Sequence, residues 1–252
     1  MRGMVNRVNV VAIFAGGVGS RMGCDIPKQF LEIYGKPIIV HTLEKFQYND
    51  SIDYIYVGCM KKYIPLVREL AKKYNLTKVR PECIIQGGKC GLETIYKLLK
   101  KIYAEFKDAT VLIHDGVRPN ITDDVINKNI EGVEKYGSAI TCVSTVETSI
   151  ISTNGKDVEQ FLDRNKVYLA KAPQSFKISD IVGAYDEVLK KYGTFNVKGL
   201  IDSCSVALSC GMNLKMVEGN RDNIKVTTPD DYVDVLGKLV VDDFFKFFSL
   251  KK

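Results

Sequence analysis

The sequence predicts an α/β protein with a mostly parallel, twisted sheet, helices on both faces and a protruding β-hairpin arm. Between residues 9 and 143, short apolar runs of strand length alternate with amphipathic segments of helix length. From 146 to 167 the chain is polar, with a turn at residues 153–155, before the alternation resumes. The length of 252 residues and the hydrophobic content of 46% suit a single domain over 1–252, with an arm at about 144–170.

The elements follow one another in the order that a parallel sheet requires. Strands are expected at residues 9–14, 54–58, 83–86, 110–114, 139–143 and 213–217. Helices are expected at residues 38–47, 64–74, 91–106, 123–136, 178–191 and 203–210, with a last one from Pro229. In such sheets ligands bind at the carboxyl ends of the strands, where the strand order reverses.

A glycine-rich loop after the first strand carries the main functional signal. It reads AGGVGSRMG from Ala15 to Gly23, and Lys28 follows shortly after it. Glycines let backbone N–H groups converge on an anion, and Arg21 and Lys28 bring two cations to the same edge. The spacing excludes both the Walker pattern and the dinucleotide-binding pattern. The segment therefore predicts a nucleoside triphosphate site, with a plain strand-to-helix connection as the alternative.

Two further polar groups follow later strands. Asp115 directly follows the strand expected at 110–114. A carboxylate at that position can meet a phosphate-bound metal ion or a substrate hydroxyl. The alternative is an ion pair with Arg118 across a tight turn, while Gly116 allows a close backbone approach. Lys225 lies between two apolar residues, so its charge must find an anion or reach solvent.

Composition narrows the class of protein. No apolar stretch approaches a membrane span, and no signal peptide precedes the first strand, so we expect a cytoplasmic protein. The net charge of +6 suits anionic small molecules, and the basic residues are spread over helix faces rather than gathered for nucleic acid. Seven cysteines without a CxxC pair, and two histidines, argue for reduced thiols rather than structural zinc.

Taken in order, these motifs resemble the cytidylyltransferases that act on polyol phosphates. The matching segments are residues 15–23, 27–29, 87–88, 114–119, 163–164, 173–174 and 222–230, with Asp202. They extend over nearly the whole chain. Two branches are similar: the methylerythritol 4-phosphate enzymes of isoprenoid synthesis, and the ribitol 5-phosphate enzymes that supply CDP-ribitol for teichoic acids and capsules. The resemblance implies a Rossmann-like nucleotidyltransferase fold that binds CTP and a polyol phosphate.

The resemblance also implies a role for each matching residue. The residues expected to bind the nucleotide are Ala15, Gly16, Gly17, Gly19, Arg21, Lys28, Gly88, Thr94 and Gly116, with Gly88 and Thr94 at the cytosine. Arg21, Lys28 and Lys225 are expected to be catalytic. Asp115, Arg164 and Lys225 would bind the polyol phosphate, with Arg164 donated by the arm of a second subunit in a homodimer. Mg²⁺ would bridge the triphosphate, and Asp115 is the candidate metal ligand.

Small departures from the family pattern bear on the acceptor. Gly91 stands where the methylerythritol branch usually has Arg, and Ala172 stands where that branch has Thr. The Ala-Gly-Gly start of the loop and Val117 look more like the ribitol branch, which makes D-ribitol 5-phosphate the expected acceptor. The alternatives are methylerythritol 4-phosphate, another sugar phosphate, or a nucleotide-binding regulatory module without turnover.

Overall fold

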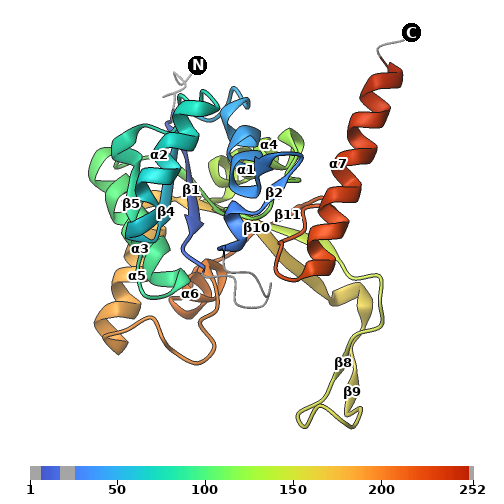
Figure 1. Cartoon of the computed structure of the whole chain (residues 1–252). Coiled ribbons are helices and arrows are strands. Elements are labelled where there is room, and N and C mark those ends of the chain that lie inside the picture. Colours follow the sequence, from blue (N-terminus) through green and yellow to red (C-terminus); the bar gives the residue numbers. More distant parts are fainter. Residues whose placement is uncertain (1–6, 18–25, 250–252) are drawn as a thin grey trace, which may run out of the picture.

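The computed structural model describes residues 7–17 and 26–249, and its centre is a seven-stranded sheet in the order β11-β7-β10-β6-β1-β4-β5 (Figure 1). The strands are β1 (Asn9–Ala15), β4 (Tyr54–Cys59), β5 (Ile84–Gln86), β6 (Thr110–Asp115), β7 (Ser138–Ser144), β10 (Tyr168–Lys177) and β11 (Met216–Glu218). Neighbours pair in parallel except at β10, which runs antiparallel to both β6 and β7. The predicted α/β fold with a mostly parallel sheet is confirmed.

Helices cover both faces of this sheet. One face carries α1 (Ile38–Gln47), α2 (Ile64–Lys73) and α4 (Asp123–Tyr136), and the other carries α3 (Gly91–Glu105), α5 (Ile178–Tyr192) and α6 (Ser203–Ser209). Because strand side chains alternate between faces, Val11 and Ile13 of β1 pack with the first group and Val10 and Ala12 with the second. The sheet is buried between two apolar layers, as parallel sheets require.

The last helix, α7 (Pro229–Ser249), packs on a third and smaller apolar cluster. That cluster joins Val235 of α7 to Val226, Val117 and Ile33. The Asp231 carboxylate accepts hydrogen bonds from the backbone N–H groups of residues 227 and 228, which fixes the helix start. Beyond this contact the helix extends away from the body (Figure 1). Residues 222–228, which include Lys225, are therefore held at the edge of the main body.

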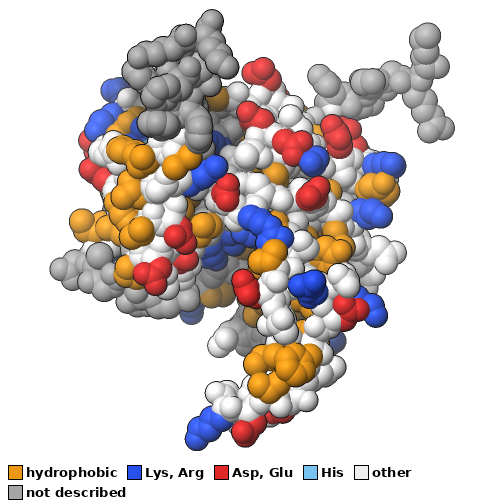
Figure 2. All heavy atoms as spheres, turned by 90° about the vertical axis from the view of Figure 1, so that its right-hand side faces the viewer, with side chains coloured by type: hydrophobic (Ala, Val, Ile, Leu, Met, Phe, Trp, Pro, Cys, Tyr) orange, Lys and Arg blue, Asp and Glu red, His pale blue; other side chains and the backbone are white. Residues whose placement is uncertain are grey.

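The arm is a two-stranded hairpin that projects from the sheet (Figure 1). It pairs β8 (Ile150–Ile151) with β9 (Gln160–Phe161), and the 3₁₀ turn η5 (Arg164–Lys166) follows. Figure 2 shows hydrophobic side chains gathered on the arm, among which Val158 and Phe161 are 56% and 68% exposed. The predicted hairpin is confirmed, whereas the single-domain boundary and the arm limits of 144–170 stay predictions.

The structure differs from the sequence-based expectation in three places. β10 was not expected, because its ten residues include Pro173 and three exposed positions at its start. The hairpin of β2 (Glu32–Ile33) and β3 (Lys36–Pro37) was also missed, and it turns through Tyr34 and Gly35, both at positive φ. The strand expected at 213–217 is β11, which begins three residues later, at Met216.

The described residues bear on two features, membrane-spanning helices and cysteines. Within 7–17 and 26–249, no helix combines the length and apolarity needed to cross a membrane. The six cysteines of that part of the chain are free thiols.

Candidate active site

The functional segments meet because β1 and β6 are parallel neighbours at the centre of the sheet. Phe14 is in register with Asp115, so the residues after each strand leave the sheet side by side. The Gly116 N–H donates to the Phe14 carbonyl at 3.1 Å, and a Cβ on Gly116 would lie 3.1 Å from that of Ala15. After β1 the chain continues in the sheet with β4 on one side, and after β6 it continues with β7 on the opposite side. The boundary between β1 and β6 is therefore a topological switch point.

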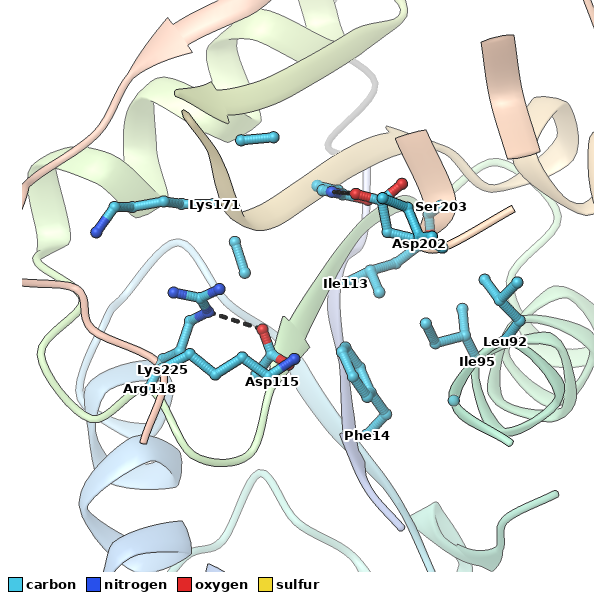
Figure 3. Close-up of a pocket in the computed structure, with 15 residues that line it drawn as sticks. Phe14, Leu92, Ile95, Ile113, Asp115, Arg118, Lys171, Asp202, Ser203 and Lys225 are labelled. Atoms are coloured by element: carbon cyan, nitrogen blue, oxygen red, sulfur yellow. Dashed lines mark hydrogen bonds and ion pairs between the residues drawn. The ribbon is translucent and has the colours of Figure 1, made fainter. Parts of the chain in front are cut away.

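Asp115 forms the electrostatic centre of the site. Its Oδ1 lies 2.6 Å from Lys225 Nζ, and its Oδ2 accepts a hydrogen bond from Arg118 Nε at 2.7 Å (Figure 3). Burial alone would raise the pKa of Asp115, but the charges of Arg118 and Lys225 outweigh it and lower the pKa to about 2. The carboxylate is therefore ionised at neutral pH. The ion pair with Arg118 was one alternative from the sequence, and Asp115 is also the anion that Lys225 required.

A third cation, Lys171, stands close to this cluster. Its Nζ donates to the backbone carbonyls of Arg221 at 2.8 Å and Asn223 at 3.4 Å. Arg118 Nη1 also donates to the Asn223 carbonyl, at 2.9 Å. Burial first, and then the charge of Arg118, lower the pKa of Lys171. Sequence reasoning missed Lys171 because it lies on β10, the unexpected strand.

His114 precedes Asp115 but does not face a substrate cavity. It is fully buried, its ring packs edge-on against Phe46, and its Nε2 lies 3.3 Å from the Arg118 carbonyl. Burial lowers the pKa of His114 to about 4, so the imidazole is neutral at pH 7. This arrangement supports the turn from 115 to 118 rather than proton transfer.

The first of two adjoining cavities, of about 390 Å³, lies between the β1 loop and the start of α3. It is lined by Phe14, Ala15, Gly16, Gly17, Lys28, Gln29, Gly88, Lys89, Cys90, Gly91, Thr94, Asp115, Val117 and Lys225. Gln29 is buried, and its Nε2 donates to the Ala15 carbonyl at 2.9 Å, which fixes the start of the glycine loop. Most of the residues predicted to bind the nucleotide are thus brought together, although Gly19 and Arg21 lie outside the described residues.

Thr94 shapes this cavity through its hydroxyl. Its Oγ1 accepts from the Gly88 N–H at 2.9 Å and donates to the Cys90 carbonyl at 2.9 Å. The side chain is buried, so the hydroxyl serves mainly to hold residues 88–90 in place. A Cβ on Gly88 would lie 2.4 Å from Glu93 Cβ, which explains the glycine there.

The second cavity, of about 260 Å³, also borders Asp115 (Figure 3). Figure 3 shows Arg118, Lys171 and Lys225 at one end of it and Asp202 and Ser203 at the other, with the apolar side chains of Leu92 and Ile95 also away from the three basic residues. Gln174 Nε2 donates to Asp202 Oδ2 at 2.7 Å, while Asp202 Oδ1 accepts from the Ser205 N–H and caps α6. The cavity is cationic at one end, apolar along its wall and polar at the other end.

Both cavities are lined by Phe14, Gly91, Asp115 and Lys225. A ligand in one would therefore meet a ligand in the other beside Asp115 and Lys225. An arrangement with glycine-loop amides and Lys28 on one side, and three basic side chains on the other, suits two phosphorylated ligands that react with each other.

Arg164 is placed away from both cavities. It lies on η5 of the arm, is exposed, and lines neither cavity of its own chain. Its predicted contact with a second subunit's acceptor stays a prediction.

The predicted Mg²⁺ would need oxygen ligands near Asp115. The described residues contain no group of three or more His, Cys, Asp or Glu side chains placed to hold a metal. Both oxygens of Asp115 are already engaged by cations. The metal role predicted for Asp115 stays a prediction, and the geometry favours its role in orienting Lys225. Mg²⁺ commonly takes substrate phosphates and water with only one or two carboxylates, which fits this donor set.

Comparison with known proteins gives a consistent result. The family model described as 2-C-methyl-D-erythritol 4-phosphate cytidylyltransferase matches residues 9–236. A curated protein of Vibrio parahaemolyticus named ribitol-5-phosphate cytidylyltransferase is 45% identical over 227 residues, which is 89% of this chain and 93% of that protein. A Streptococcus agalactiae protein of the same name is 42% identical over 89% of this chain and 92% of its own length.

Solved structures agree with the fold. The 2-C-methyl-D-erythritol 4-phosphate cytidylyltransferase of Francisella tularensis has a TM-score of 0.72 at 29% identity, over 90% of this chain and 99% of that one. A 4-diphosphocytidyl-2C-methyl-D-erythritol synthase from Anaerococcus prevotii has a TM-score of 0.78 at 24% identity, over 93% and 96% of the two chains. The second likeness supports the fold alone.

Proposed function

The chain belongs to the 2-C-methyl-D-erythritol 4-phosphate cytidylyltransferase family, and on that premise we propose that it condenses CTP with D-ribitol 5-phosphate. The products would be CDP-ribitol and pyrophosphate. The observation that carries the proposal is the pair of cavities meeting at Asp115 and Lys225, one beside a glycine loop and one with a basic end. The names of the curated relatives support ribitol 5-phosphate as the acceptor.

In the proposed reaction the acceptor supplies its own nucleophile. A phosphate monoester with a second pKa near about 6 is mostly dianionic at neutral pH. Its oxygen attacks the α-phosphorus of CTP, a new P–O bond forms, and the bond to the β-phosphate oxygen breaks as pyrophosphate leaves. No side chain has to act as nucleophile or strong base, so catalysis consists of positioning and charge stabilisation.

The nucleotide would lie in the cavity beside the glycine loop. Backbone N–H groups of residues 15–17 and the Lys28 ammonium would contact the triphosphate, and Arg21 and Gly19 are proposed to join them. Residues 88–90, which the Thr94 hydroxyl holds in place, would surround the cytosine. Gly116, which the resemblance assigns to the nucleotide, lines neither cavity and packs against Ala15, so its part in the proposal is to let β6 lie close to β1. Lys28 and Arg21 would offset the charge that develops on the departing pyrophosphate.

The acceptor would lie in the second cavity, with its phosphate toward Lys225, Arg118 and Lys171. Three basic side chains against one carboxylate, Asp115, leave an excess of positive charge at that end, which suits a dianionic phosphate. Asp115 orients Lys225 and Arg118 instead of meeting the phosphate directly. The hydroxyl groups of the polyol would reach toward Asp202 and Gln174.

The proposal extends to a metal ion, a homodimer and a cellular location. Mg²⁺ would be held mainly by triphosphate oxygens and would supply charge neutralisation during pyrophosphate departure. The exposed apolar arm supports a homodimer in which Arg164 reaches the partner's acceptor. The dimer and a cytoplasmic location remain part of this proposal.

Pyrophosphate release tests the proposal directly. The assay is run with CTP, UTP, ATP and GTP against ribitol 5-phosphate and methylerythritol 4-phosphate. We expect turnover with CTP and ribitol 5-phosphate. Faster turnover with methylerythritol 4-phosphate would support the second candidate, which the matching family model favours. If CTP raised the melting temperature and no acceptor, including other sugar phosphates, gave product, a regulatory nucleotide-binding module would be the better conclusion.

A further inference from the structure

Gly91 occupies a special position between the two cavities. It is the first residue of α3, follows the helix-capping residue Cys90, and lines both cavities together with Phe14, Asp115 and Lys225. Residues 88–90 border only the first cavity, whereas Leu92 and Ile95 border only the second. Gly91 therefore marks the point at which one cavity passes into the other.

Other glycines near this point are explained by packing. A Cβ on Gly87 would lie 2.9 Å from Thr94 Oγ1, and one on Gly88 would lie 2.4 Å from Glu93 Cβ. A Cβ on Gly116 would lie 3.1 Å from Ala15 Cβ. A side chain at any of these positions would collide with its neighbours or crowd them.

Within the described residues, neither packing nor backbone geometry explains Gly91. A Cβ built there meets no described heavy atom within 4 Å outside its own helix backbone and chain neighbours, and its φ is outside the positive range that favours glycine. Glycine also has a low helix propensity, so the start of α3 does not itself require a glycine. The protein keeps an open space here.

We propose that Gly91 keeps the passage between the two cavities open for the reacting phosphates. The inference rests on the proposed function, since it needs one ligand in each cavity. The acceptor oxygen must approach the α-phosphorus of CTP in line with the leaving group, beside Asp115 and Lys225. A side chain at position 91 would project into the space that this approach requires.

Gly91→Ala and Gly91→Leu test the inference, with Gly183→Ala as the matched control. Gly183 is an exposed helical glycine of α5 whose added Cβ also meets nothing within 4 Å, and it lines neither cavity. For each protein we would measure the melting temperature, CTP binding without acceptor by calorimetry, and steady-state kinetics with CTP and the acceptor.

We expect both Gly91 variants to melt at the same temperature as the wild type or higher, since Ala and Leu favour helices. CTP binding without acceptor should be retained, because the first cavity keeps its other walls. The kcat/KM for ribitol 5-phosphate should fall about tenfold for Gly91→Ala, and further for Gly91→Leu. Gly183→Ala should keep full activity.

The outcomes separate the two proposals. Unchanged kcat/KM in a folded, CTP-binding Gly91→Leu enzyme would overturn the role of Gly91 and leave the proposed function intact. Loss of CTP binding in step with loss of activity would also overturn it, since the side chain would then block the nucleotide alone. A wild-type enzyme without turnover on any acceptor would overturn the proposed function, and this inference with it.

Discussion

Replacing Asp115 by Asn tests whether the buried charge cluster organises the site. The variant keeps the shape of the side chain but removes the negative charge that Lys225 and Arg118 share at 2.6 and 2.7 Å. The side chains of Asp115 and Arg118 are 7% and 12% exposed, so water screens the remaining charge of Arg118 poorly, whereas Lys225, at 41% exposed, can turn to solvent. The pKa of Asp115 falls from 3.8 to about 2, and each pKa unit corresponds to about 1.4 kcal/mol. We therefore expect the free energy of unfolding to fall by about 2 to 3 kcal/mol at pH 7.

The pH dependence gives a second signature. A carboxyl group whose folded pKa is lowered stabilises the protein above its unfolded pKa, and that stability is lost as pH falls through the folded pKa. The difference between wild type and Asp115→Asn should thus be constant at neutral pH and shrink between about pH 4 and about pH 2. Urea unfolding followed by circular dichroism measures it, since the chain has no tryptophan.

The matched control is Asp108→Asn. Asp108 pairs with Arg7 at 3.0 Å, but its side chain is 70% exposed, so we expect a loss of less than about 1 kcal/mol. Equal losses for the two variants would refute the argument, and so would a difference for Asp115→Asn that does not shrink in acid.

Three further predictions concern catalysis and assembly. Lys28→Ala should lower kcat about a hundredfold or more, the scale of losing one preorganised charge donor, and near-normal pyrophosphate release would remove Lys28 from the mechanism. Lys171→Met should raise the KM for the acceptor about tenfold, with the KM for CTP unchanged and rescue by Lys171→Arg, since the positive charge proposed to face the acceptor phosphate is lost together with the two hydrogen bonds that hold residues 221 and 223. A KM for CTP that rises equally would contradict this. An Arg164→Ala protein and a Lys28→Ala protein should each have low activity alone and should recover activity when their subunits are mixed to form heterodimers, because one site then has both residues. Heterodimers without this recovery would place Arg164 outside the partner's site.

The fold and half of the site follow from local sequence signals. Apolar runs place β1 and β6, and the residues at their carboxyl ends, Ala15 and Asp115, are the ones that the structure brings together. Parallel pairing makes such neighbours predictable, because every strand end then faces the same edge of the sheet. The charge on Lys225 could be expected to need an anion, although the sequence does not name Asp115 as its partner.

The other half depends on β10, which local signals did not reveal. Pro173 interrupts the strand pattern, and the register of β10 against β7 shifts between Ala170 and Gln174. Lys171 and Gln174 reach the second cavity, where the acceptor is proposed to bind, only because β10 runs antiparallel between β6 and β7. Long-range pairing of this kind leaves no periodic pattern in the sequence. The sequence therefore indicates the nucleotide side of the site better than the acceptor side.

The same strand links the arm to the second cavity, the proposed acceptor site. β10 begins at Tyr168, two residues after the 3₁₀ turn that carries Arg164, and its Lys171 and Ala172 hold the segment before Lys225. Asn223 is buried, its Nδ2 donates to the Ala172 carbonyl at 2.7 Å, and its own carbonyl accepts from Arg118 and Lys171. A partner bound to the arm would act on the strand whose hydrogen bonds set the position of Lys225. Dimer formation and acceptor binding are therefore expected to be coupled, so that weakening the arm contact, for example by Phe161→Asp, should raise the KM for the acceptor before it alters CTP binding. A monomeric Phe161→Asp enzyme with an unchanged acceptor KM would show that the two are independent.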